Sequence, residues 1–304
     1  MAYITGRRSY LAIGSQSAPG AAATPTISLA LTGDSGLNIT RETNFTVQTE
    51  GQQYDPVNYW YSGKWGEGRI EARLHPAYDG SLISWILQRD SNGETPYFTI
   101  DQCLGSVVQY RFVDCKINTA TITINSGEQA TIGMDIVAKN GTSISATAGP
   151  AVGTTLPWTG VEASITIGGT SYSSVCRSVE FTINNNVAAP RDMLRFNSIT
   201  PISLPAGGRE ITGRISLDLK TADAKEANVD TTALLRSICS GPVEGTVVVT
   251  LTKGSLTRSY TFPRAVLHTA TGLEVPGSPT ALKAIEITFN ALSPNGTTAA
   301  LTVT

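Results

Sequence analysis

The stretch WGEGRIEARLHPAYDGSLISWILQ (65–88) predicts a β-strand followed directly by an α-helix. In its first part, Ile70, Ala72 and Leu74 alternate with charged residues, which is the period of two that a half-buried strand requires. In its second part, apolar residues recur three and four positions apart, which favours a helix over 79–89. The stretch therefore predicts one strand-then-helix unit.

The same unit occurs a second time, about 145 residues further along the chain. GREITGRISLDL (208–219) alternates like the first strand, and DTTALLRSICSG (230–241) predicts a helix over 230–240. Farther on, YRF (110–112) and YTF (260–262) are each followed after six residues by Thr-Ala-Thr. Because these matches keep one order along the chain, the sequence predicts a tandem duplication.

The repeat divides the chain into an N-terminal arm (1–26), a first domain (27–150), a linker (151–157) and a second domain (158–304). The boundary is placed where AGPAVGTTLPWTG gathers glycine and proline, residues typical of connections between folded units. Each half is long enough to bury a hydrophobic core of its own.

The composition is that of short strands joined by turns. Charged residues make up 15% of the chain, and Thr, Ser, Gly, Val and Ile are abundant. A formal net charge of −2 disfavours a protein that binds nucleic acid tightly, because phosphate contacts need clustered Lys and Arg. No apolar segment has the length of a signal peptide or a membrane span, so we expect folding in the cytoplasm and no membrane partner.

Residues that could carry out catalysis are few. The two histidines, His75 and His268, lie at unrelated points of the repeat, and the four cysteines form no CxxC pair. GEG (66–68) precedes no helix and so lacks the context of a phosphate-binding loop. The acidic residues are scattered along polar strand faces. We therefore expect no enzyme activity, no cofactor and no metal ion.

The aromatic segment YDPVNYWYSGKW (54–65) is the most distinctive candidate for a binding surface. It suits a sugar-binding loop, a protein–protein contact, or a loop packed on its own domain. It falls in a predicted long loop (43–64), which corresponds to a second long loop (185–207), and loops of such length are usually functional. The candidate contact residues in the two loops are Tyr54, Tyr59, Trp60, Tyr61, Leu194 and Phe196.

The order of these elements resembles that of the tail tube (major tail) proteins of tailed bacteriophages. The resemblance rests on the arm TGRRSYLAIG, the strand GKWGEGRIEARL with its helix, and the strands YFTID, YRFVDCKINTATITI and ATIGMDIVAKN. In the second half, ITIGGTSYSSVCRSVEFTINNNV resembles the start of a tube domain. The resemblance implies a mainly β protein with two tandem β-sandwich or flattened-barrel domains, each with one flanking α-helix.

What the resemblance implies for function is a building block of the phage tail. Six tube domains close a ring, so a two-domain chain would form pseudo-hexameric rings from trimers, and the rings would stack into a hollow tube. The implied partners are further copies of the chain and other tail proteins such as the tape measure and tail terminator. DNA would pass through the lumen without specific binding. The implied location is the virion tail, assembled in the host cytoplasm.

In such a tube the polar strand faces would line the lumen. The residues expected there are Arg69, Glu71, Arg73, Arg214, Ser216 and Asp218. A neutral to acidic wall would let DNA slide, because no stripe of cations displaces its counterions. The alternative is a phage or cell-surface decoration or adhesin module that binds glycans through the aromatic segment. Electron microscopy separates the two, since only the tube protein would form rings or tubes.

Overall fold

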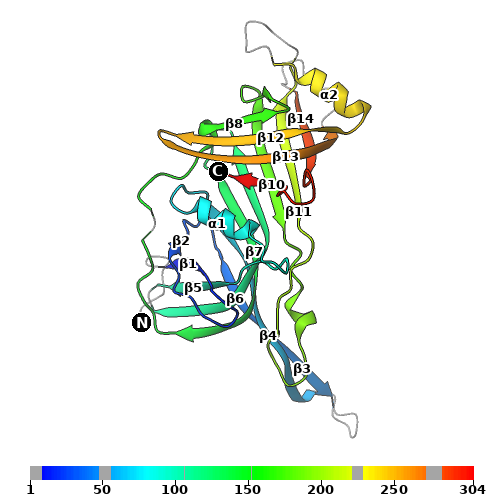
Figure 1. Cartoon of the computed structure of the whole chain (residues 1–304). Coiled ribbons are helices and arrows are strands. Elements are labelled where there is room, and N and C mark those ends of the chain that lie inside the picture. The colour runs from blue at the N-terminus through cyan, green and yellow to red at the C-terminus, as the bar shows by residue number, and fades with distance from the viewer. Residues whose placement is uncertain (1–8, 48–55, 106, 152, 221–228, 272–282) are drawn as a thin grey trace.

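The computed structural model describes residues 9–47, 56–105, 107–151, 153–220, 229–271 and 283–304. Strands of this part of the chain join into one antiparallel sheet of 15 strands, and two α-helices pack beside it (Figure 1). The prediction of a mainly β protein with two helices is confirmed.

The first half of the chain forms a sheet whose strands are out of sequence order. Its described elements are β1 (Tyr10–Ser15), β2 (Ile27–Ser28), β3 (Gly36–Val47), β4 (Pro56–Arg73), α1 (Asp79–Leu87), β5 (Phe98–Leu104), β6 (Val108–Asn125) and β7 (Thr131–Ile144). In space the strands follow the order β3-β4-β7-β6-β5-β1-β2. The helix α1 follows the second strand of this series.

The second half repeats this spatial order. Its described elements are η1 (Gly160–Glu162), β8 (Ala163–Ile167), β9 (Thr170–Ser171), β10 (Cys176–Asn184), η2 (Pro190–Met193), β11 (Glu210–Asp218), α2 (Thr231–Ser240), β12 (Val243–Lys253), β13 (Leu256–Thr271), β14 (Ala284–Ala291) and β15 (Thr302–Val303). The strands follow the order β10-β11-β14-β13-β12-β8-β9, and β15 pairs with β13. Here too the helix, α2, follows the second strand of the series.

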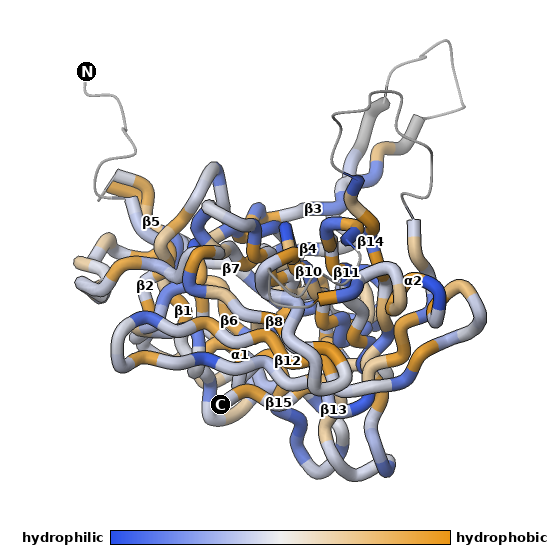
Figure 2. Tube along the Cα trace, turned by 90° about the horizontal axis from the view of Figure 1, so that it is seen from above, coloured by the Kyte–Doolittle hydropathy of each residue, from blue (hydrophilic) through white to orange (hydrophobic). Residues whose placement is uncertain are grey.

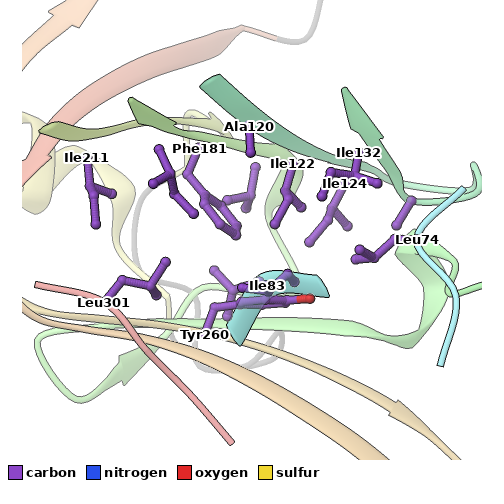
Figure 3. Close-up of a cluster of buried hydrophobic side chains, with 14 of the residues drawn as sticks. Leu74, Ile83, Ala120, Ile122, Ile124, Ile132, Phe181, Ile211, Tyr260 and Leu301 are labelled. Carbon is purple, nitrogen blue, oxygen red and sulfur yellow. The ribbon is translucent and has the colours of Figure 1, made fainter. Parts of the chain in front are cut away.

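The two halves are joined through their sheets. β10 pairs antiparallel with β6, so that 178–184 lie opposite 119–125. One hydrophobic core runs through both halves, and hydrophobic segments alternate with hydrophilic ones along the strands (Figure 2). Phe181 and Ile122 from the joined strands face Ile83 of α1 (Figure 3), and the Phe181 ring packs directly on Tyr260 of β13, with centroids 5.2 Å apart.

The glycine of the repeated triplet Gly-Arg-Ile, Gly68 in the first half and Gly213 in the second, is required for steric reasons. A Cβ at Gly68 would lie 2.1 Å from the carbonyl oxygen of Gly36 on the neighbouring strand. A Cβ at Gly213 would lie 2.2 Å from the ring of Phe289, which covers it. Both distances are far below van der Waals contact, so each position requires glycine where two strands meet.

A buried carboxylate holds α1 against the second half. Asp79 is fully buried and accepts hydrogen bonds from Trp158 Nε1 at 2.8 Å and from Arg258 Nε and Nη2 at 3.1 Å each. A buried charge costs several kcal/mol unless it is paired and hydrogen-bonded, and here both conditions hold. The strand β13 is thereby fixed over α1.

We expect Asp79→Ala to lower the free energy of unfolding by about 3–5 kcal/mol, because Arg258 and the Trp158 indole lose their shared partner. Urea denaturation followed by tryptophan fluorescence measures this loss. The exposed Glu210 provides a control with the same change in charge, and Glu210→Ala should cost less than about 0.5 kcal/mol. Equal losses in the two variants would contradict a role for the buried carboxylate.

Candidate functional surfaces

A polar face extends across both halves of the chain. It belongs to six strands that lie side by side in the order β4-β7-β6-β10-β11-β14. On each strand, core residues alternate with exposed or half-buried ones, which places the second set on the opposite side of the sheet. The polar face consists mainly of Arg69, Glu71, Thr119, Thr121, Thr123, Asp135, Glu180, Thr182, Arg214 and Glu286.

Charges on the polar face neutralise one another locally. Arg214 contacts Glu180 at 3.2 Å and Glu286 at 3.4 Å, so it links β11 to the strands on both sides. Arg69 contacts Glu71 at 2.9 Å, and this hydrogen bond raises the pKa of the Arg69 guanidinium. These side chains are about half exposed, so each pair contributes little to folding. The polar face is therefore exposed to solvent, and its charges are paired.

The six predicted lumen residues lie on this face, in two groups. Arg69, Glu71 and Arg73 project from β4, and the other group projects from β11. The second group is Arg214, Ser216 and Asp218. Three strands separate β4 from β11, so the sheet brings the groups onto one face without bringing them into contact. Their role in a lumen stays a prediction.

The predicted loop over 43–64 is wrong, because most of it is strand. β3 pairs with β4 from Gly36 opposite Arg69 as far as Val47 opposite Pro56, and the resulting hairpin projects beyond the rest of the protein (Figure 1). Aromatic and β-branched residues suit a pleated strand, and this preference outweighs the turn-forming residues nearby. The candidate residue Tyr54 lies outside the described residues.

The hairpin carries exposed aromatic side chains. Phe45, Tyr59 and Tyr61 are 65%, 62% and 52% exposed, and their rings form a row with centroids 6.4 and 5.7 Å apart. Trp60 lies next to them along the chain and is 50% exposed. A cluster of this size on a projecting hairpin is typical of a protein–protein contact.

The other candidate segment lies along the same hairpin. Arg191 of η2 contacts Glu42 at 2.6 Å, and the N–H of Lys64 donates to the carbonyl of Ile199 at 2.6 Å. The two candidate residues of this segment, Leu194 and Phe196, differ in their exposure to solvent. Leu194 is half-buried against the hairpin at Gly63, whereas Phe196 is fully exposed and free to contact another molecule.

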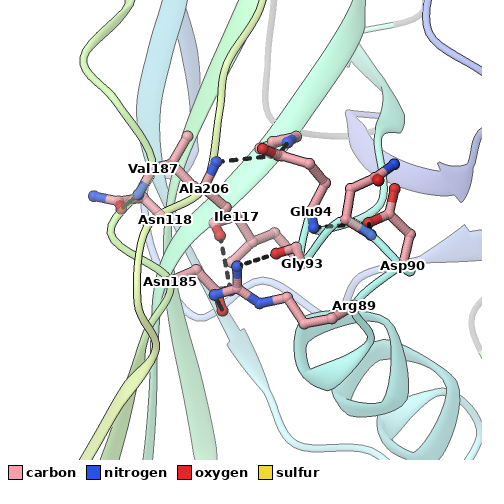
Figure 4. Close-up of polar contacts among 11 residues, drawn as sticks. Arg89, Asp90, Gly93, Glu94, Ile117, Asn118, Asn185, Val187 and Ala206 are labelled. Atoms are coloured by element: carbon pink, nitrogen blue, oxygen red, sulfur yellow. Dashed lines mark hydrogen bonds and ion pairs between the residues drawn. The ribbon is translucent and has the colours of Figure 1, made fainter.

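A buried polar cluster between the halves was not predicted from the sequence (Figure 4). Asn185 donates to the carbonyls of Ile86 and Ile117 at 3.3 and 3.2 Å. Its Oδ1 accepts from Arg89 at 3.3 Å and from Arg209 at 3.1 Å. Burial, with a contribution from the neighbouring Arg89 charge, lowers the pKa of Arg209 to about 10. This cluster fixes the ends of β10 and β11 to the C-terminal end of α1.

Lys116 extends the cluster. Its side chain is completely buried, and its Nζ lies 2.5 Å from Glu94 and 4.5 Å from the centre of the Tyr97 ring. Glu94 also accepts the N–H of Ala206 at 3.1 Å. The available signal was the single lysine of a strand that also carries Arg111 and Asp114, but an alternating pattern places such a lysine on a solvated face.

The remaining candidate groups have structural surroundings. His75 is buried, with Nδ1 accepting the N–H of Ala77 at 3.1 Å and Nε2 2.6 Å from the carbonyl of Thr155. His268 is exposed beside Thr269. Within the described ranges, no group of His, Cys, Asp and Glu side chains has the arrangement of a metal site.

None of the helices in the described residues is both long and apolar enough to cross a membrane.

An antiparallel β-protein with a wetted polar face and a projecting aromatic hairpin belongs to the class of structural proteins that work through their surfaces. Comparison with known families agrees with this class. The family model described as phage tail tube protein matches residues 6–291, nearly the whole chain. The chain therefore belongs to the phage tail tube family. No curated protein matches it.

Proposed function

We propose that trimers of this chain close into pseudo-hexameric rings, which stack into the hollow tube through which phage DNA is delivered. The family assigns the chain a structural role in the tail tube. The ring itself is supported by one observation above all: the two halves use their strands in the same spatial order. Two equivalent domains per chain, near 27–150 and 158–304, would let three chains complete a six-fold circle.

Strand register supports the equivalence of the two halves. Arg69 lies opposite Asp135 of β7, and Arg214 lies opposite Thr288 of β14. Each arginine follows the glycine of its Gly-Arg-Ile triplet. The helix stripes also correspond, since Leu82 and Ile86 in α1 match Leu234 and Ile238 in α2.

The long bent strands β6 and β13 correspond residue by residue. Tyr110 lies opposite Gln102 of β5, as Tyr260 lies opposite Val249 of β12. Both strands then carry a register shift, between Ile117 and Thr119 in β6 and between Leu267 and Thr269 in β13. Thr119–Thr121 of β6 therefore correspond to Thr269–Thr271 of β13.

This correspondence leaves one chain with two complementary free edges. Within the chain, β10 covers the edge of β6 at Thr119–Thr121. The counterpart of β10 is β3, which pairs only with β4 among the described strands. The counterpart segment of β13, Thr269–Thr271, pairs only with β14 in the same part of the chain. Pairing β3 of one copy with β13 of the next would satisfy both edges and close the ring.

The lumen of such a ring would be lined by the polar face. Its paired charges give passing DNA no continuous row of cations to bind, so the phosphates keep their counterions. The six predicted lumen residues belong to this wall. The aromatic hairpin and Phe196 project from the ring and supply contacts for the next ring. Tape measure and tail terminator proteins are the further partners, in a virion tail assembled in the host cytoplasm.

The pairing of β3 with β13 can be tested by cross-linking. Asn184 lies opposite Thr119, which predicts that Thr40 lies opposite Thr269 of the neighbouring copy. In a Cys239→Ser background, Thr40→Cys with Thr269→Cys should oxidise to closed covalent trimers, seen by mass spectrometry, because directly opposed strand residues are within reach of a disulfide. Thr40→Cys with Thr257→Cys is the control and should stay monomeric. Assembled protein without inter-copy disulfides at 40 and 269 would contradict the proposed ring.

The lumen assignment predicts an effect on DNA passage. Glu71→Lys with Asp218→Lys should change the free energy of unfolding by less than about 1 kcal/mol, since both carboxylates lie in partly exposed pairs. In assembled phage the added cations should slow DNA ejection, more strongly at low ionic strength. The measurement is ejection rate against salt concentration, with Glu244→Lys, on β12, as the control. Loss of tube assembly would place Glu71 and Asp218 at a subunit interface, and parental ejection rates from assembled phage would contradict the lumen assignment.

The aromatic hairpin predicts an effect on stacking. Trp60→Ala with Tyr61→Ala should leave soluble, folded protein with an unchanged circular dichroism spectrum, because both side chains are half exposed. Negative-stain electron microscopy should show rings or short stacks in place of long tubes, since large aromatic anchors dominate protein–protein contacts. Thr252→Ala, an exposed change on β12, is the control. Full-length tubes from the double variant would contradict the stacking role.

A further inference from the structure

We propose that Arg41 and Lys64 form a basic clamp that binds the C-terminal end of α2 in the neighbouring copy. The inference rests on the proposed ring and assigns residues to its interface between copies. The template is the buried polar cluster, which already joins one domain to the other inside the chain. Its partners between copies follow from the correspondence of the two halves.

In the template, two side chains from β10 and β11 reach the end of α1. Asn185 follows the last residue of β10 and donates to the Ile86 carbonyl at 3.3 Å. Arg209 precedes the first residue of β11 and donates to the same carbonyl at 3.4 Å. The two are joined to each other at 3.1 Å. They act as one unit that closes the C-terminal end of the helix.

The strand registers show which residues of the β3–β4 hairpin correspond to Asn185 and Arg209. Asn184 pairs with Glu210, as Thr40 pairs with Trp65. The next residue after Asn184 is Asn185, and the next after Thr40 is Arg41, so Asn185 corresponds to Arg41. In the same way Arg209 corresponds to Lys64. Arg41 and Lys64 lie directly opposite each other on β3 and β4.

The helix end that would be bound is that of α2. Its Ile238 carbonyl corresponds to the Ile86 carbonyl of α1, because each isoleucine lies one turn after the matching leucine, Leu82 or Leu234. Pairing of β3 with the neighbouring β13 would bring the two cations to this helix end.

Among the described residues, these surfaces are at least partly uncovered. Arg41 is exposed, and with Lys64, Tyr61 and Ile199 it lines an open pocket of about 270 Å³. In α1, Ile83 is fully buried beneath β13 and β15 of the second half. Its counterpart in α2, Leu235, is only partly buried. A second copy placed as in the template would cover the exposed side of α2.

The electrostatics favour cations at this position. At the end of α1, Arg209 faces the like charge of Arg89, and Asn185 Oδ1 accepts from both. The position of α2 that corresponds to Arg89 is Gly241, the C-cap residue, which has no side chain to carry an opposing charge. The C-terminal end of a helix carries partial negative charge and attracts Arg and Lys. Two cations can therefore replace the asparagine–arginine unit of the template.

A charge-swap experiment tests the clamp in the full chain. Arg41→Glu with Lys64→Glu should weaken assembly at least tenfold, measured as the protein concentration at half-assembly by analytical ultracentrifugation, because two anions would face the helix end. Ser240→Arg, exposed in the last turn of α2, should also weaken assembly of the parent. The three changes together should restore it, since the swapped charges attract. Thr252→Glu, exposed on β12, is the control and should assemble like the parent.

The outcomes separate the clamp from the ring. Normal assembly of the Arg41→Glu, Lys64→Glu variant, or no restoration by Ser240→Arg while melting temperatures stay at the parent value, would overturn the clamp. If closed trimers still formed through the cysteines at 40 and 269 in that case, the ring would stand. If the parent with these cysteines assembled without cross-linking, the ring itself would be wrong and the clamp with it.

Discussion

The ladder between β6 and β10 is the interaction on which the rest of the architecture depends. Without β10, the edge of β6 from Thr119 to Asn125 would present unpaired N–H and C=O groups beside a hydrophobic core. With it, the sheets of the two halves become continuous, and so does the polar face on their outer side. The same pairing places Phe181 over α1 and against Tyr260 of β13, and Asp79 of α1 binds Arg258 of that same strand. The pairing of β6 with β10 thus determines both the shared hydrophobic core and the continuous polar face.

The same constraint applies to the outer edges of β3 and of Thr269–Thr271 in β13, which no strand of the described residues covers. Each half offers one sheet edge through β3 or β10, and its long strand, β6 or β13, needs a partner strand at its register shift. Within one chain, β10 and β6 form one such junction during folding, when ordering is a unimolecular event. In the proposed ring the other junction is formed by association, which loses translational and rotational freedom. Covalent duplication therefore halves the number of junctions that a six-fold ring must form between separate molecules.

Sequence patterns predicted the elements better than the surfaces between them. Alternation around Ile70 and Ile215 and the three-and-four spacing in α1 and α2 reflect which side faces the core, so they were readable from local sequence. The hairpin at Tyr59–Tyr61 was misread because its strands extend past the core, where alternation of apolar and polar residues is no longer required. The cluster around Asn185 and Lys116 was missed for a different reason. Its partners come from segments far apart in the chain, and no local pattern distinguishes them from solvated polar residues.

In the proposed ring the two junctions must also differ in chemistry, because one of them would be exposed to water before assembly. Inside the chain, a completely buried Lys116 and a buried Asn185 are acceptable, since their partners are present as soon as the protein folds. A sheet edge that is exposed until another copy binds cannot rely on buried polar side chains of this kind. An apolar edge strand, in turn, would pair with other strands unspecifically. Charged residues on an edge strand keep it soluble and suppress such pairing. Arg41 and Lys64 meet both demands: they are solvated on the free hairpin, and a helix end of opposite partial charge can accept them when the correct neighbour arrives.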